Sequence, residues 1–279
     1  MRSWLPTTSS SPPGFEVTLD QRHLQRFLTP LTAVDGPTQL TIADDQLLAT
    51  TVDDTMVTAV ETTLHKSLCE EYTVAPGGFA LDPAVFADIL AAERQTDVPA
   101  RLTFDADTTT LTLTLPSFVQ TQPVDTDTTV EMPGVGDPVQ GATTYHDAEE
   151  LAHAIDYFGD RSAIVALGYD GPTDTFYLET VSESATAAVD TRYRRPQTDL
   201  AATGAPAPAR SAFPVDALAA VLGAAPPESV VRADYAETFP AKFAWDLTGG
   251  DGITDGTLTP VTALVAPCEI DAEASPETD

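Results

Sequence analysis

The chain has 279 residues, of which 42% are hydrophobic and 20% charged, and 43 acidic against 13 basic residues give a net charge of −30. This composition is typical of a folded globular protein and excludes a largely disordered one. No apolar run reaches the ~18 residues of a membrane-spanning helix. Two isolated cysteines, Cys69 and Cys268, are too few for a disulfide framework and fit a reducing compartment.

A shortage of lysine accompanies the acidic charge. Only Lys66 and Lys242 are lysines, while Ala, Thr, Asp and Val are abundant. This combination indicates adaptation to a salt-rich cytoplasm, where a Debye length of about 3 Å at ~1 M salt screens the self-repulsion. The alternative is an ordinary acidic protein. Under the first interpretation the acidity says little about partners, because neighbouring proteins would be acidic too.

Residues 1–14 carry one arginine followed by serines and prolines and lack the apolar core of a signal peptide. We expect them to form a disordered extension. Residues 15–122 then alternate between strand and helix signals. Helices are predicted at Leu19–Leu28 and Asp82–Arg94. The predicted strands cover Phe15–Leu19, three runs within 39–64 separated by Asp-rich turns, an extended piece at Tyr72–Phe79 and three runs within 100–123.

Residues 123–137 are rich in Pro, Gly and Asp without a clear period, which is typical of a connector. Strand and helix signals return in 138–271, with helices predicted at His146–Phe158 and Pro214–Leu222. Because the elements follow in the same order as before, we predict an α+β protein of two similar domains, 15–122 and 138–271. Each pairs antiparallel strands with two helices. Residues 272–279 are expected to form an acidic tail.

The second domain is predicted to end in a hairpin. Phe239–Leu247 has the alternation of a half-buried strand, and the β-rich run Thr257–Val265 stops before Pro267, which cannot donate to a sheet ladder. A glycine- and aspartate-rich loop joins the two runs. A chain that ends on a core hairpin is expected to use it to close a sheet.

Motifs of catalysis are absent. The sequence holds no P-loop, GxSxG, CxxC or GxGxxG motif, and Asp105 with Asp107 suits a hairpin turn better than a calcium loop. The four histidines lack metal-ligand partners at suitable spacing; we predict that His146 and His153 are solvated helix positions. The sequence therefore argues against an enzyme and implies neither a cofactor nor a metal.

Four segments, which follow one another along the chain in the order of the family, resemble DNA polymerase sliding clamps of the proliferating-cell-nuclear-antigen (PCNA) type. The ending LVAPCEID resembles the Leu-Ala-Pro-x-Ile close of that family. TVDDTMVTAVETTL resembles its Met/Val-Asp strand and the apolar strand after it. YTVAPGGFALDPAVFADILAA resembles its second helix and lead-in, and VEMPG resembles the turn of its interdomain loop. The resemblance covers about Phe15 to Asp271, and we identify the chain as a divergent, archaeal and salt-adapted member.

The resemblance implies a homotrimeric ring with its sheets outside and its four helices lining a hole for duplex DNA. A clamp loader would place the ring on DNA, where it would tether DNA polymerase and other replication or repair enzymes as a processivity factor. Ser117–Gln122 would pair with Ala185–Tyr193 of the next subunit. Arg94 and Arg101 would lie near the first edge and the acidic helix Asp147–Asp156 near the second, so we also expect ion pairs across this joint.

The resemblance also implies two sets of site residues. The partner pocket would be formed by Val52, Met56, Val57, Val130, Met132, Pro133, Pro240, Leu264, Val265, Ala266 and Pro267, although core packing is the alternative for Val57 and Val265. The residues facing DNA would be Arg22, Arg26 and Arg94.

Two features depart from the family. Clamps carry several basic residues on the hole-lining helices, but here the third helix is acidic and the fourth has no basic residue. No aromatic residue stands immediately before the segment Leu264–Pro267, so the partner motif is expected to differ. A clamp-fold paralogue that binds proteins without encircling DNA therefore remains an alternative, and a metal-assisted hydrolase is disfavoured by its missing ligands.

Overall fold

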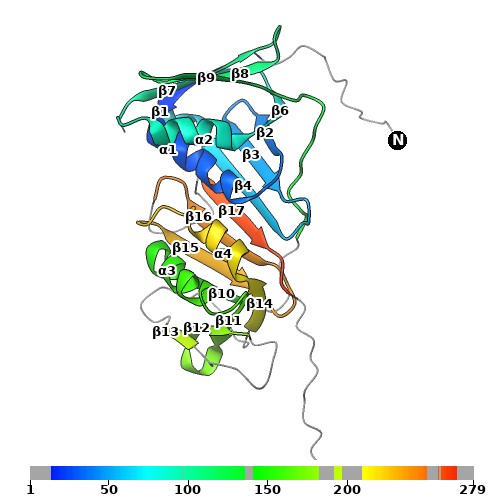
Figure 1. Ribbon diagram of the computed structural model, residues 1–279, viewed down its shortest axis with the longest axis vertical. Helices are drawn as coiled ribbons and strands as arrows, with labels where there is room; N and C mark the ends of the chain where they lie inside the picture. The colour runs from blue at the N-terminus through cyan, green and yellow to red at the C-terminus, as the bar shows by residue number, and fades with distance from the viewer. Residues whose placement is uncertain are drawn as a thin grey trace, which may run out of the picture.

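The computed structural model describes residues 14–95, 97–135, 141–181, 192–196, 209–249, 257 and 259–268. The predicted disordered extension, apart from Gly14, and the predicted acidic tail lie outside these ranges. The described part contains antiparallel sheets and four α-helices, which confirms the predicted α+β class (Figure 1).

A five-stranded sheet begins the fold. Its order is β5-β1-β7-β8-β9, and every neighbouring pair is antiparallel. In that order the strands span Cys69–Val74, Phe15–Asp20, Pro99–Asp105, Thr110–Thr114 and Val119–Pro123.

An eight-stranded sheet joins the two halves of the chain, because β17 of the terminal hairpin pairs with β4 of the first half. The prediction that the ending closes a sheet is thereby confirmed. Its order is β10-β15-β16-β17-β4-β3-β2-β6. In that order the strands span Ala142–Asp147, Val230–Tyr235, Ala241–Asp246, Pro260–Val265, Thr58–His65, Gln46–Val52, Thr38–Ile42 and Gly77–Leu81.

A four-stranded antiparallel sheet completes the second half, in the order β13-β12-β11-β14. In that order its strands span Arg192–Pro196, Thr175–Thr180, Ile164–Asp170 and Ala209–Pro214. Among the described strands, β9 is an outer strand of the five-stranded sheet, and β13 is an outer strand of the four-stranded sheet. The first predicted pairing segment, Ser117–Gln122, overlaps most of β9, and the second, Ala185–Tyr193, overlaps β13 at Arg192 and Tyr193. The rest of the second segment lies outside the described ranges.

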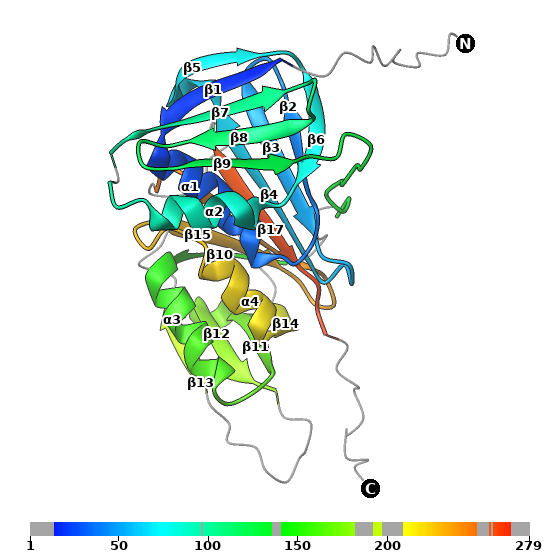
Figure 2. The same ribbon diagram turned by 45° about the horizontal axis from the view of Figure 1, so that its top comes forward.

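In Figure 1 the four helices lie in front of the eight-stranded sheet. The turned view of Figure 2 shows the five-stranded sheet above α1 and α2. They are α1 (Gln21–Leu28), α2 (Pro83–Ala92), α3 (Ala148–Gly159) and α4 (Val215–Leu222). Aspartates cap three of them: Asp20, Asp82 and Asp147 each accept a backbone N–H of the first turn. The caps explain why α1 and α3 begin later than predicted.

The cap at Asp147 also corrects the prediction for His146. This residue belongs to strand β10 and is buried, with its Nε2 2.8 Å from Thr144 Oγ1 and its ring 4.2 Å from that of Phe176. Burial lowers the pKa of His146 to about 3. It is a neutral core side chain rather than a solvated helix position.

The extended piece predicted at Tyr72–Phe79 is in fact two strands in different sheets. β5 ends at Val74 in the five-stranded sheet, and β6 begins at Gly77 in the eight-stranded one. Pro76 lies between them and has no N–H for a ladder, so the chain changes sheet there.

Candidate functional site

A tight loop between β3 and β4 presents Met56 to solvent. The carboxylate of Asp53 accepts hydrogen bonds from the backbone N–H groups of Thr55, Val57 and Thr58 at 2.7, 3.1 and 2.5 Å. Met56 is held at φ +57°, the left-handed region that non-glycine residues rarely adopt, and its side chain is 71% exposed. An unusual backbone conformation beneath an exposed apolar side chain makes this loop a candidate binding site.

Asp53→Ala is expected to lower the free energy of unfolding by about 0.5–2 kcal/mol, as loss of a capping carboxylate does. Burial opposes ionisation of Asp53, but the hydrogen bonds outweigh it and lower its pKa below 3.8. Its stabilisation is therefore complete above pH 3.8 and is lost as the pH falls through the lowered value. Denaturant unfolding at several pH values measures this, with the exposed neighbour in Asp54→Ala as the control. Equal losses for both variants would contradict the role of Asp53.

The end of β17 lies beside this loop. Ala266 donates its N–H to the carbonyl of Val57 at 2.7 Å, and Leu264 is directly opposite Ala59. Sheet pairing therefore brings Val52, Val57 and the segment 264–267 together. Val52, Val57, Ala266 and Pro267 are half-buried, and Leu264 is buried.

Val265 differs from its neighbours because its side chain has no exposed surface and belongs to the hydrophobic core. Val265 therefore fits the alternative of core packing, and its side chain cannot contact a partner protein. Val130, Met132, Pro133 and Pro240 are half-buried. Within the described part of the chain, no hydrogen bond connects Val130, Met132 or Pro133 to the loop or to β17.

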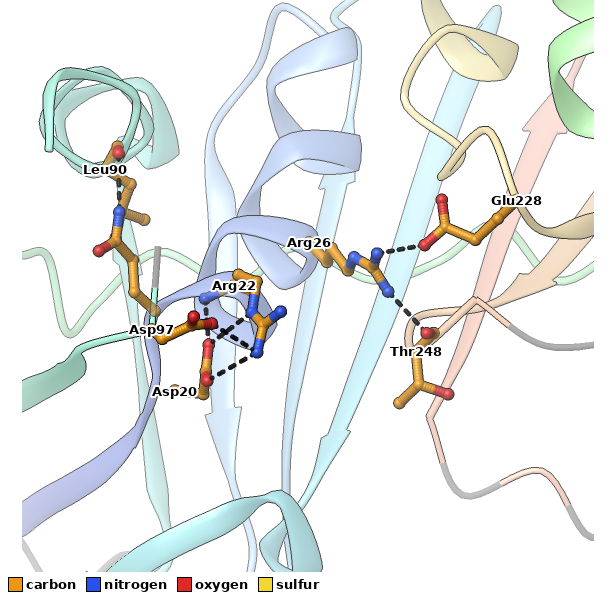
Figure 3. Close-up of polar contacts among 8 residues, drawn as sticks. Asp20, Arg22, Arg26, Leu90, Asp97, Glu228 and Thr248 are labelled. Carbon is orange, nitrogen blue, oxygen red and sulfur yellow. Dashed lines mark hydrogen bonds and ion pairs between the residues drawn. The ribbon is translucent and has the colours of Figure 1, made fainter. Parts of the chain in front are cut away.

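The arginines expected to face DNA are largely engaged within the chain (Figure 3). Arg22 lies 3.3 Å from Asp20 and 2.8 Å from Asp97. Arg26 is ion-paired with Glu228 and donates to the carbonyl of Thr248 at 2.6 Å, so it connects α1 to the second half. Arg94 is exposed, and its guanidinium has no partner among the described residues.

The helices are acidic as a group. α1 carries two arginines, whereas α2, α3 and α4 together carry five carboxylates and no lysine or arginine. The hydrogen bond and charge of Asp20 raise the pKa of Arg22, as expected for an ion pair. Few cationic groups on this face are thus available to an external phosphate.

Two exposed apolar residues that the sequence did not single out lie on or beside the outer strands β9 and β13. Val119 on β9 is 68% exposed, and Tyr157 on α3, which faces β13, is 46% exposed. A cavity of about 340 Å³ lies between α3 and β13 and is lined by Glu150, His153, Ala154, Tyr157, Phe158, Arg192 and Tyr193. The sequence feature that could have pointed to this cavity is the run Arg192–Arg195, which holds three arginines in a strongly acidic chain.

The predicted ion pairs across an intersubunit joint are partly pre-empted. Glu150 of α3 already contacts Arg195 and the hydroxyl of Tyr193 on β13. Arg101 lies 2.7 Å from Glu16 in its own sheet. These groups would have to exchange partners to form pairs with a second copy.

The described residues contain no group of three or more His, Cys, Asp or Glu side chains that could hold a metal ion. Burial raises the pKa of the Cys69 thiol to about 11, which keeps it protonated and unreactive. Among the described helices, none has the length and apolar character to cross a membrane.

Comparison with known proteins identifies the fold. No protein-family model and no curated protein sequence matches the chain. The chain is similar to the solved structure of A. fulgidus PCNA bound to the C-terminal region of FEN-1, with a TM-score of 0.76 and 18% identity over 93% of this chain and 100% of that one. Thermococcus kodakaraensis PCNA matches with a TM-score of 0.75 and 16% identity over 91% and 100%. Entamoeba histolytica PCNA matches with a TM-score of 0.74 and 13% identity over 91% and 99%. The chain therefore has the fold of the PCNA sliding clamps.

Proposed function

We propose that the protein is a sliding clamp, a homotrimeric ring that encircles duplex DNA and tethers DNA polymerase and other replication or repair enzymes. The observation that carries the proposal is the clamp fold over more than nine-tenths of the chain. It agrees with the positions of the three exposed large apolar side chains among the described residues: Met56 beside the end of β17, Val119 on β9, and Tyr157 next to β13. We infer that Met56 contacts partner proteins, whereas Val119 and Tyr157 are covered where subunits of the ring meet.

In this ring, residues 15–122 and 138–271 act as two clamp domains joined by the connector 123–137. The described outer strand β9 of one subunit would meet β13 of the next, and pairing would cover strand edges that otherwise invite aggregation. The four helices would line the hole, and a clamp loader would open and close the ring. We place the protein in the cytoplasm of a salt-adapted archaeal cell, with no catalytic role.

Partner proteins would bind beside the β3–β4 loop. Sheet pairing brings one part of this proposed surface together. Its residues would be Val52, Met56, Val57, Leu264, Ala266 and Pro267. Val130, Met132 and Pro133 of the connector and Pro240 would complete it. A short partner motif that buries Met56 would also shield its strained backbone from water.

Retention on DNA is expected to depend on topology rather than charge. Phosphate affinity falls with salt, with a log–log slope of about −0.9 per phosphate neutralised, and Arg22 and Arg26 are already paired. We expect negligible binding to short linear duplexes but stable retention on circular DNA after loading. Arg22→Gln with Arg94→Gln should leave retention on circles nearly intact, whereas Arg26→Ala would also remove a contact between the two halves.

The measurement compares release of loaded protein from intact circles with release after the circles are linearised. Fast release on linearisation alone supports a ring. Equal release from both forms would contradict encirclement and favour the second candidate, a clamp-fold paralogue that binds proteins without encircling DNA. The acidic helix face is the observation that favours this candidate.

A further inference from the structure

Arginines gather on one face of the four-stranded sheet. Tyr193 and Arg195 of β13 contact Glu150 of helix α3, so the alternate residues Arg192 and Arg194 point to the face away from the helices. Residues directly opposite one another on antiparallel strands share a face. Two adjacent rows therefore cross this face: Arg192, Glu179, Ala166 and Ala212 in the first, and Arg194, Tyr177, Gly168 and Arg210 in the second. We call these eight residues the arginine face.

Short contacts fix the shape of the arginine face. The carboxylate of Glu179 accepts hydrogen bonds from Nε of Arg192 at 3.0 Å and from Nε of Arg210 at 2.7 Å. The Arg192 guanidinium also lies 4.4 Å from the centre of the Tyr177 ring. A Cβ at Gly168 would lie 2.0 Å from Cζ of Tyr177, so only glycine lets this ring lie flat on the sheet. The result is a preorganised platform of guanidinium groups around one aromatic ring.

The charges of the arginine face do not balance. The face carries three arginines and one carboxylate, Glu179, which contacts Arg192 and Arg210. The exposed side chain of Arg194 has no partner in the part of the chain that the structure describes. An excess of positive charge is unusual in a chain with 13 basic residues and a net charge of −30. Guanidinium groups in a fixed arrangement are well suited to bind carboxylates.

A carboxylate-rich segment of the same chain begins at this sheet. Cys268 donates its N–H to the carbonyl of Ala212 at 2.8 Å, and Arg210 is two residues away on β14, about 7 Å along the strand. Residues 269–279 hold five carboxylate side chains and no lysine or arginine. Eleven residues can span about 36 Å, more than the ~14 Å across the sheet from β14 to β13.

We propose that residues 269–279 dock on the arginine face, with their carboxylates against Arg210 and Arg194. A segment tethered at Cys268 acts at an effective concentration of roughly millimolar, so weak contacts suffice to hold it. Because salt screens these contacts, docking weakens as the salt concentration rises. It requires neither a ring nor a partner protein, so its failure and the failure of the clamp function are separable.

The experiment measures fluorescence anisotropy of a labelled peptide with the sequence of residues 269–279. It is added to the full chain and to a chain ending at Cys268, over a range of KCl concentrations. The shortened chain should bind the peptide, with affinity falling as KCl rises. The full chain should bind at least tenfold more weakly, because its own segment occupies the face.

Two variants of the shortened chain locate the contact. Arg194→Gln with Arg210→Gln should weaken peptide binding at least tenfold. Arg22→Gln with Arg101→Gln removes the same charge elsewhere and should leave binding within about twofold. The single variant Arg194→Gln should also bind the peptide more weakly. Because Arg194 has no partner among the described residues, this weaker binding would not reflect a folding defect.

A third variant tests occupancy within the full chain. Replacing the five carboxylates of 269–279 with the corresponding amides should restore peptide binding to the level of the shortened chain. Equal affinity of the full and shortened chains would overturn the proposal. So would an affinity that the arginine-face variants leave unchanged, or an absence of binding at the lowest salt at which the chain is folded.

Discussion

Val119→Lys is expected to convert the proposed trimer into monomers at micromolar concentration. Val119 is 68% exposed on β9, so a polar residue costs the isolated subunit little. In the ring it would be covered beside β13, where burial of a valine side chain contributes about 1.5 kcal/mol or more. The new cation would also lie near Arg192 and Arg194, and like charges across neighbouring strands repel. Together these effects predict at least a tenfold weaker joint.

Light scattering measures the mass at the lowest salt at which the unaltered protein is a trimer of its 29.5 kDa chain. Thr114→Lys is a matched control, because Thr114 is exposed and directly opposite Val119 on the inner strand β8. It adds the same charge without entering the joint and should stay trimeric. Val119→Asp should dissociate less than Val119→Lys, since an anion would meet the arginines. A trimer with Val119→Lys would exclude β9 from the joint.

Met56→Ala with Met132→Ala is expected to weaken partner binding at least tenfold. Burial of a methionine side chain contributes about 1.5–3 kcal/mol, and 1.4 kcal/mol corresponds to a factor of ten in affinity. Met56 has few contacts to lose within the subunit, because 71% of its surface is exposed. The reduced affinity should therefore appear without a comparable loss of stability or of the ring.

A peptide from the C-terminal region of FEN-1 is a suitable probe, since that region is bound to A. fulgidus PCNA in a structure similar to this chain. Isothermal calorimetry gives its affinity for the double variant and for Asp54→Ala, a control in the same loop. Unchanged affinity of the double variant would count against the pocket. Leu264→Ala is a poorer test, because Leu264 is 7% exposed and its truncation would also leave a cavity.

Most element types and their order could be predicted from the amino-acid sequence. Local signals were enough for this: Asp82 followed by Pro83 marks the start of α2, the Asp-rich turns separate β2, β3 and β4, and the glycine-rich loop marks the terminal hairpin. The same patterns, together with the ending LVAPCEID, indicated the clamp fold that the solved structures show. Hydrophobic period and turn chemistry act over a few residues, so a single chain carries them.

The surroundings of individual side chains, in contrast, became clear only from the fold. A one-residue shift in pairing register exchanges the two faces of a strand. The cap at Asp147 left His146 in strand β10, and the register of β10 against β15 turned its side chain into the core; sheet pairing likewise buried Val265. Arg26 looked available to DNA until folding brought Glu228, 202 residues away, against it. The arginine face likewise combines residues from four strands, and the chain leaves β17 beside it at Cys268. Ion pairs and sheet faces depend on contacts between distant residues, and local sequence patterns do not contain that information.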